Sequence, residues 1–305
     1  MADNPKFVWV DGRLVAWNDA TVHITQMGIA TVSLVYEGIR AYWNPAEQTA
    51  YVFQLDAHVH RLMQSMRLVR MKPTLTAHDL AQGVLDTLHA NQVAGDIYIR
   101  PFAFTEALTF STAATDVPRL AITTQPWSTR LLSGKVAHAC VSSWTRISDN
   151  IMPARIKASS NYLNSRYASE EAKRNGYDVA LFLNAQAKVS EGPGACVMIV
   201  RDGKLITPSV TSDILESITR TTLMQLCREV LNIEVVEREV DRTELYIADE
   251  AFLCGTGMEI TPIASVDRFT LGAGGIGPIT QRIETLYHNL VRGIDKSHPE
   301  WRTMV

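Results

Sequence analysis

One segment without a regular hydrophobic period constrains the fold of this chain more than any other feature. Residues 127–137 follow neither the two-residue period of a strand nor the 3.6-residue period of a helix, and they include Gly134. The parts before and after this segment each contain strand and helix patterns of their own. We therefore predict an α/β protein with a small α+β domain at residues 1–126, an interdomain loop at 127–137 and a larger α/β domain at 138–305.

The first part begins with a predicted β-hairpin. Two short apolar runs flank Asp11-Gly12, a dipeptide that favours the tight turn between antiparallel strands. Residues 55–69 have apolar side chains at helical spacing, and Thr76 with Asp79 resembles a capping box that opens a second helix. Apolar runs at 96–104 and 119–127 predict further strands.

The second part alternates strand and helix patterns. A helical pattern runs from Tyr162 to Arg174 and ends at Asn175-Gly176, a normal C-terminal cap. Strands are predicted around residues 138–144, 178–184, 187–192, 197–208, 233–240 and 251–257, and further helices at 219–231, 243–250 and 278–291.

Composition narrows the classes of function. The chain of 305 residues is 46% hydrophobic and 20% charged, with a net charge of −3, so it has no basic excess for binding nucleic acid. Its four cysteines form no CxxC pair, which argues against a disulfide framework or a structural metal site. A polar N-terminus and the lack of long apolar runs predict a cytoplasmic protein with a small-molecule partner and no membrane contact.

Three features of the second part together indicate pyridoxal phosphate. Lys157 lies among small and apolar residues before a helix, where a partly desolvated amine could form a Schiff base. Glu191 ends a strand before Gly192-Pro193-Gly194 and could keep the pyridine nitrogen protonated. The segment 217–220 opens a helix, whose backbone N–H groups bind phosphate.

A glycine-rich segment offers a competing hypothesis. Residues 272–277 fit the pattern GxGxxG between a strand and a helix, which is typical of nicotinamide-dependent oxidoreductases. Too few residues follow this segment to complete a dinucleotide-binding unit, and Pro278 is a normal first residue of a helix. His58 and His60 point apart on a helix, so we expect no metal site there.

The ordered set of motifs resembles the class IV pyridoxal phosphate aminotransferases, and the branched-chain amino acid aminotransferases in particular. The similarity extends over nearly the whole chain, and many short matches in order make it specific. The matching segments are residues 35–40, 60–62, 98–101, 157–163, 190–192, 218–220 and 255–262.

This resemblance implies a fold of type IV and a role for each candidate residue. Lys157 would be the Schiff-base lysine and proton shuttle, Glu191 the partner of the pyridine nitrogen, and Tyr162 the partner of the phenolate oxygen. The implied phosphate cup consists of Arg61, Ile218, Thr219 and Thr256, and the implied substrate site of Tyr36, Tyr98, Arg100, Thr256 and Gly257. It also implies a homodimer or a higher homo-oligomer.

Some positions depart from the pattern of these enzymes, and they bear on the substrate. Thr31 and Arg130 stand where aromatic residues are common, Ser217 replaces a glycine, and Cys196 replaces an asparagine. The expected reaction moves an amino group between branched-chain L-amino acids and 2-oxoglutarate, with Arg100 or Arg130 binding the distal carboxylate. Because Thr31 and Arg130 would alter the pocket, a D-amino acid or (R)-amine transaminase and an aminodeoxychorismate lyase remain as alternatives.

Overall fold

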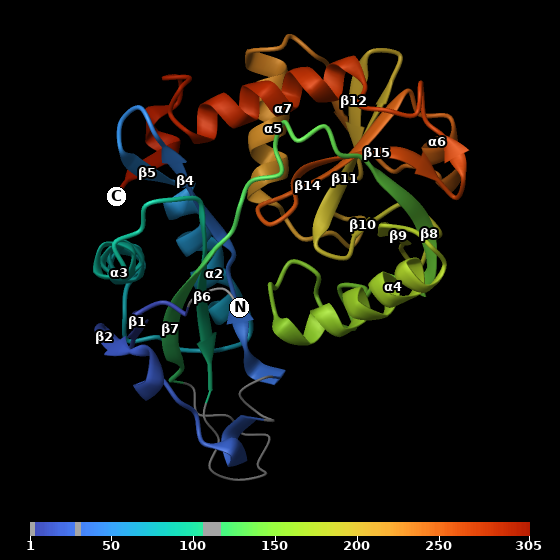
Figure 1. Cartoon of the computed structure of the whole chain (residues 1–305). Helices are drawn as coiled ribbons and strands as arrows, with labels where there is room; N and C mark the ends of the chain where they lie inside the picture. The colour runs from blue at the N-terminus through green and yellow to red at the C-terminus, as the bar shows by residue number, and fades with distance from the viewer. Residues whose placement is uncertain (1–3, 28–31, 106–116) are drawn as a thin grey trace. The chain divides into compact units, whose positions relative to one another are not determined.

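The computed structural model describes residues 4–27, 32–105 and 117–305 (Figure 1). The backbone divides into two compact units. The first consists of Met1–Ser128, Ile156–Ser160 and Leu290–Val305, and the second of Thr129–Arg155 and Asn161–Asn289. The domain boundaries predicted at residues 126 and 138 stay a prediction. Among the described residues, no helix combines the length and apolar character that crossing a membrane requires.

The first unit is built on an antiparallel sheet with the strand order β17-β5-β4-β6-β7-β1-β2, and β3 also pairs with β6. Its strands are β1 (Phe7–Val10), β2 (Arg13–Ala16), β3 (Val35–Tyr36), β4 (Ile39–Asn44), β5 (Thr49–Phe53), β6 (Ile97–Phe104), β7 (Arg119–Pro126) and β17 (Arg302–Met304). Short 3-10 turns lie at Trp17–Asp19, Ile24–Gln26 and Pro299–Trp301.

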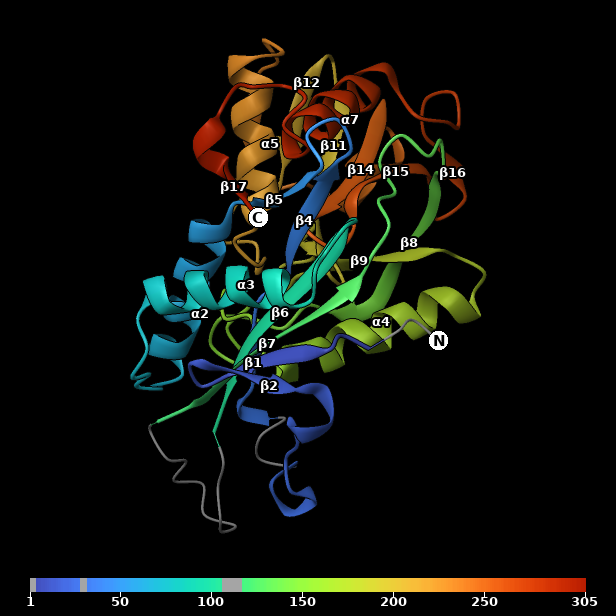
Figure 2. The same cartoon turned by 60° about the vertical axis from the view of Figure 1, so that its left-hand side comes forward.

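The predicted local signals of the first unit are confirmed. Asp11 and Gly12 both adopt positive φ angles, 47° and 95°, and connect β1 to β2. Helix α2 (Leu55–Leu68) packs beside α3 (Ala77–Ala90), as Figure 2 shows. Thr76 caps α3 through the reciprocal bonds of a capping box with Asp79.

The second unit contains a mixed sheet with the strand order β13-β12-β11-β14-β15-β8-β9, with β10 on β11 and β16 on β15. Its strands are β8 (Ala137–Thr145), β9 (Val179–Leu183), β10 (Glu191–Gly192), β11 (Ala195–Arg201), β12 (Lys204–Thr207), β13 (Val235–Glu237), β14 (Glu250–Gly255), β15 (Glu259–Val266) and β16 (Phe269–Thr270). Its helices are α4 (Tyr162–Arg174), α5 (Ile218–Glu229), α6 (Arg242–Tyr246) and α7 (Pro278–Val291), whose last residues belong to the first unit. A 3-10 turn, Ser159–Asn161, precedes α4.

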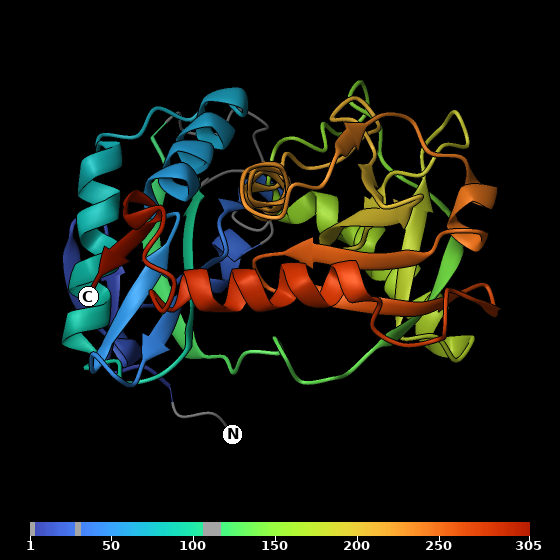
Figure 3. The same ribbon diagram turned by 90° about the horizontal axis from the view of Figure 1, so that it is seen from above.

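Two helices pack on different parts of the second sheet. Helix α4 packs on the parallel strands β8 and β9, and α5, seen end-on in Figure 3, packs on β14. The antiparallel pairs β11–β14 and β14–β15 join these regions. The connection after β10 and the hairpin between β14 and β15 consequently lie near each other.

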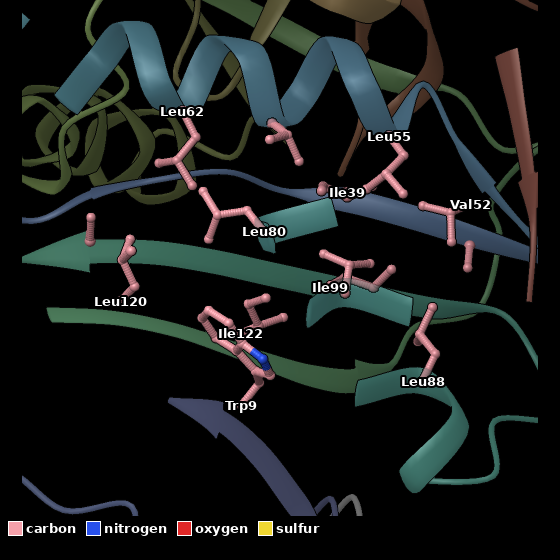
Figure 4. Close-up of a cluster of buried hydrophobic side chains, with 14 of the residues drawn as sticks. Trp9, Ile39, Val52, Leu55, Leu62, Leu80, Leu88, Ile99, Leu120 and Ile122 are labelled. Atoms are coloured by element: carbon pink, nitrogen blue, oxygen red, sulfur yellow. The ribbon is translucent and has the colours of Figure 1, made fainter. Parts of the chain in front are cut away.

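The apolar core of the first unit fills the space between its two long helices and the sheet (Figure 4). Leu62 of α2 and Leu80 of α3 face Ile99 of β6, and all three side chains are at most 1% exposed. Burying one such side chain stabilises the fold by roughly 1.5–3 kcal/mol. Ala158 belongs to the same cluster, which fixes the segment around residue 157 to this core.

The glycine-rich segment 272–277 has a structural role that does not suit a dinucleotide. The carboxylate of Glu250 accepts hydrogen bonds from the N–H groups of Ile279 and Thr280 at 2.9 and 2.7 Å, so it already occupies the start of α7. A Cβ added at Gly277 would lie 2.0 Å from the Glu250 side chain. The missing side chain therefore makes room for an internal anion.

Candidate active site

Lys157 is held in a backbone ladder beside β3. The N–H of Tyr36 donates to the Lys157 carbonyl at 3.0 Å, and the Ser159 N–H donates to the Leu34 carbonyl at 2.8 Å. Val35 and Ala158 form an isolated antiparallel bridge between these two bonds. Lys157 belongs to the first unit, and its position is fixed by main-chain bonds to residues 34–36.

The ring of Tyr36 contacts two cations. The ammonium nitrogen of Lys157 lies 4.8 Å from the ring centroid, and the guanidinium carbon of Arg100 lies 4.7 Å from it. Distances of this size are typical of cation–π attraction. The structure thus brings together three of the residues predicted from the sequence, an amine and a guanidinium on one aromatic ring.

Tyr98 lies opposite Arg40 in the pairing of β6 with β4. Its ring is 5.3 Å from that of Trp127, and a Cβ added at Gly38 would lie 1.9 Å from the Tyr98 hydroxyl. The buried Arg40 donates to the Trp127 carbonyl at 2.6 Å. A glycine at position 38 is therefore what leaves room for the Tyr98 phenol.

Arg61 is oriented by two buried residues. Its Nε and Nη2 donate to the carboxylate of Glu37 at 2.7 and 2.8 Å, and His58 Nδ1 donates to the same group at 2.7 Å. Burial opposes ionisation of Glu37, but Arg61 and His58 outweigh it and lower the pKa of Glu37 to about 2. The Arg61 side chain is 12% exposed whereas Glu37 is fully buried, so the arginine is the member that can reach a ligand.

Glu191 of β10 forms a buried ion pair in the second unit. Arg146 lies 2.7 Å from Glu191 Oε1, and the two side chains are 7% and 5% exposed. The Leu215 N–H donates to Glu191 Oε2 at 3.2 Å, and the Cys196 thiol lies 3.9 Å from that oxygen. These donors favour the ionised carboxylate.

The start of α5 keeps its first amides available. Ser217 caps the helix by accepting from the Arg220 N–H at 3.2 Å, and Arg220 itself is anchored to Thr207 and Pro208 at 3.0 and 2.8 Å. The first N–H groups of a helix, here those of Ile218 and Thr219, have no partner within the helix. They provide a seat for an anion.

The turn between β14 and β15 holds Thr256 and Gly257, because Gly255 pairs directly with Glu259. Gly194, which follows the Glu191 turn, lies next to Gly255. A Cβ added at Gly194 or Gly257 would meet no atom within 4 Å, so both glycines face open space. A cavity of about 630 Å³ in this unit is lined by Gly194, Met258 and Arg130 among others.

The remaining predicted residues are placed less completely. Tyr162 is the first residue of α4, and Asn164 of the same turn accepts from Arg146 Nη1 at 3.3 Å, which links this helix start to Glu191. Thr31 lies outside the described residues.

The supporting roles of Glu37, His58 and Arg146 were not predicted from the sequence, where His58 was considered only as a metal ligand. The only sequence signal was that Glu37 lies inside the matched segment 35–40 and His58 three positions before Arg61.

Comparisons with known proteins agree with this geometry. The family model described as "Amino-transferase class IV" matches residues 34–266. A probable branched-chain-amino-acid aminotransferase of Aquifex aeolicus is 38% identical over 98% of this chain and 96% of its own length.

Two solved structures are also similar over nearly their whole length. The PLP form of the branched-chain aminotransferase from Thermobaculum terrenum is 50% identical, with a TM-score of 0.96 over 99% of this chain and 98% of that one. The branched-chain aminotransferase of T.th., complexed with N-(5'-phosphopyridoxyl)-L-glutamate, is 30% identical, with a TM-score of 0.92 over 98% of both chains. The candidate residues of each unit include an arginine–glutamate pair, and the similarities extend over nearly the whole chain. The chain therefore belongs to the class IV aminotransferases.

Proposed function

We propose that this protein is a pyridoxal phosphate-dependent transaminase that moves the amino group between branched-chain L-amino acids and 2-oxoglutarate. The observation that carries the proposal is the Tyr36 ring with Lys157 and Arg100 on it. An amine for amino-group chemistry and a guanidinium for a distal carboxylate are thereby held on the same aromatic side chain. The related T.th. structure contains a pyridoxyl adduct of glutamate, which supports a glutamate-accepting site.

The residues present fit the cofactor. Lys157 supplies the amine, Arg61 and the amides of Ile218 and Thr219 supply groups for a phosphate, and Glu191 supplies a buried carboxylate for a pyridinium. Gly194 faces open space, where a planar ring can approach the backbone. When bound, the cofactor supplies an electron sink for the carbanion that forms when the α-proton leaves.

The protein's own groups then have distinct tasks. Lys157 Nζ would hold the cofactor in the resting enzyme. Once the substrate amine had displaced it, the free amine would carry the proton to and from the α-carbon. Arg146 and the Leu215 N–H keep Glu191 ionised, so that it can hold the proton on the pyridine nitrogen. Tyr162 would donate to the ring oxygen, and Thr256 would complete the phosphate cup.

The substrate site must accept both the apolar side chain of a branched-chain amino acid and the charged side chain of glutamate. Tyr98 and the Thr256-Gly257 turn would bind the α-carboxylate. Arg100 would bind the distal carboxylate of glutamate in a bidentate manner and lie against Tyr36 when the side chain is apolar. Arg130, which lines the cavity of the second unit, is the second candidate for this carboxylate.

A substrate panel tests the function. The purified protein should be yellow, and its absorption band should bleach with L-leucine, L-valine, L-isoleucine and L-glutamate. D-amino acids and (R)-amines should bleach it far more slowly. Faster half-reactions with D-alanine or an (R)-amine would move the assignment to the alternative transaminases.

The lysine and arginine assignments have their own tests. Borohydride reduction followed by peptide mapping should place the cofactor on Lys157, and Lys157→Ala should abolish turnover in a folded protein. Arg100→Ala should weaken glutamate by roughly 2–4 kcal/mol and spare leucine. A glutamate-selective loss in Arg130→Ala alone would move that role to the loop.

The proposal includes a homodimer or higher oligomer in the cytoplasm and the domain boundaries at residues 126 and 138. These follow from the resemblance and the sequence patterns. Light scattering of the purified protein tests the oligomeric state.

A further inference from the structure

The β14–β15 hairpin carries an unusual residue at its end. Gly255 pairs with Glu259, so Thr256, Gly257 and Met258 form the connecting loop. Glu259, the first residue after this loop, adopts φ 52°, a left-handed conformation that favours glycine. A side chain at such a position costs about 1 kcal/mol, which points to a use for the carboxylate.

The Glu259 carboxylate is fully buried and binds the start of the segment that connects the two parts of the chain. Thr129 Oγ1 donates to its Oε1 at 2.8 Å, and the Arg130 N–H donates to its Oε2 at 2.6 Å. The Thr129 hydroxyl also accepts from the Leu131 N–H at 3.1 Å. One carboxylate thus fixes two consecutive residues, the second of which is Arg130.

A second buried carboxylate continues this contact. Glu284 of α7, 3% exposed, accepts from the Leu132 N–H at 2.8 Å. Beyond Leu132 the hydrogen bonds are longer, 3.2 Å from the Ser133 N–H to the Arg130 carbonyl and 3.4 Å from the Lys135 N–H to Ser133. Residues 129–132 are therefore anchored by acids from two different elements.

We propose that Glu259 is a positioning residue that couples the Thr256-Gly257 turn to the Thr129-Arg130 segment, and so sets the affinity of the site for its carboxylate substrates. This inference rests on the proposed function, since it assigns substrate contacts to that turn. The hairpin ends in the candidate carboxylate-binding turn, and Glu259 is its first residue after the loop. A displacement of the turn must therefore be transmitted to Arg130, which lines the same cavity as Met258.

Two variants separate the side chain from the backbone. Glu259→Gly removes the carboxylate but suits the positive φ angle, and Glu259→Gln keeps one acceptor while placing an N–H group against a donor. Glu284→Ala is the matched control, because it removes the acceptor of the Leu132 N–H on α7 without removing a hydrogen bond of Glu259. We expect both Glu259 variants to raise KM for 2-oxoglutarate and leucine about tenfold, with kcat within about twofold of the wild type. The loss of cofactor affinity should be smaller than the rise in KM, since Thr256 is only one member of the phosphate cup. The control should leave KM within about twofold.

Limited trypsin digestion of the holoenzyme reports the anchor without using activity. Cleavage after Arg130 should become about tenfold faster in Glu259→Gly, whereas cleavage after Lys135, beyond the anchored residues, should change little. Unchanged cleavage and KM in an active Glu259→Gly enzyme would overturn the coupling and leave the proposed function standing. A parallel loss of kcat and thermal stability would also overturn it, because that pattern indicates a structural role only. If the wild type uses no amino donor, the proposed function fails, and with it the substrate role of Glu259.

Discussion

Each unit of this protein contains an arginine–glutamate pair at its candidate site. In one pair the arginine is the residue proposed to contact the cofactor, and in the other it is the glutamate. In the first unit Glu37 is fully buried and Arg61 is 12% exposed, so the acid supports and the arginine is presented. In the second unit Arg146 supports, and Glu191 is the residue with the proposed chemical role. A buried ion pair therefore does not reveal by itself which partner acts.

The difference lies in the surroundings of each carboxylate. Glu37 receives three side-chain hydrogen bonds from Arg61 and His58, which engage both of its oxygens inside the core. Glu191 pairs with Arg146 at 2.7 Å and accepts a longer bond from the Leu215 N–H at 3.2 Å, and its side chain is 5% exposed whereas that of Glu37 is fully buried. A ligand proton can approach the second arrangement more readily than the first.

The largest expected effect on the reaction rate comes from changing Glu191, the residue of the second pair that would contact the cofactor. Glu191→Gln should slow the half-reaction by on the order of 10²–10⁴-fold, because a neutral amide cannot hold the pyridine nitrogen protonated. The cofactor should stay bound, which its absorbance after gel filtration checks. Stopped-flow rates near those of the wild type would contradict the assigned role of Glu191.

Removing Arg146, which supports Glu191, should mainly lower the stability of the fold. Arg146→Met leaves Glu191 buried without its cation, so the free energy of unfolding of the cofactor-free protein should fall by about 3–5 kcal/mol. The double variant Arg146→Met with Glu191→Met should regain that stability, because no uncompensated charge remains. Urea unfolding measures both, and a double variant as unstable as the single one would break the comparison.

The stability of the protein at low pH should report on the pair of Glu37 and Arg61. The folded pKa of Glu37, about 2, lies below its ordinary value of 4.5, so ionised Glu37 stabilises the fold. This contribution, about 3 kcal/mol, should be complete above pH 4.5 and lost as the pH falls toward 2. Unfolding free energies measured from about pH 5 to pH 2 should show this loss, and Glu37→Gln should reduce the slope. An unchanged slope in the variant would remove Glu37 as its source.

The smallest effect concerns the ligand contact of Arg61. Glu37→Gln should weaken cofactor binding about tenfold, roughly 1.4 kcal/mol, because Arg61 loses its fixed orientation but can still reach water. Glu47→Gln is the matched control, since Glu47 pairs with Lys296 on the surface, where an ion pair contributes little. Equal losses in both variants would show that the orientation of Arg61 is immaterial.

The fold and the presented residues were predictable because their signals are local. The Asp11-Gly12 turn, the Thr76 capping box and the helix starting at Tyr162 each depend on residues a few positions apart, and all are confirmed. Lys157 and Glu191 were candidates because of their local settings, and the resemblance to class IV aminotransferases, which the family match confirms, added Arg61.

The supporting residues could not be predicted in the same way. Arg146 meets Glu191 only because β8 and β10 belong to one folded sheet system, and no spacing in the sequence encodes that contact. The bond of Arg130 to Glu259 is likewise a product of tertiary structure. The glycine-rich segment 272–277 is the opposite case, because its sequence matches a dinucleotide-binding motif but its structure does not serve that function. The Glu250 carboxylate accepts the hydrogen bonds at the start of the helix that follows this segment.

The close approach of Gly38 and Tyr98 limits the order in which this site can change during evolution. A methyl group at residue 38 would occupy the position of the Tyr98 phenol, whose ring is also fixed against Trp127. Alanine at position 38 would displace the phenol as long as Tyr98 is present, whereas the same substitution would meet no such clash once residue 98 had become smaller. The effect of a substitution at position 38 therefore depends on residue 98, and the two positions are epistatic.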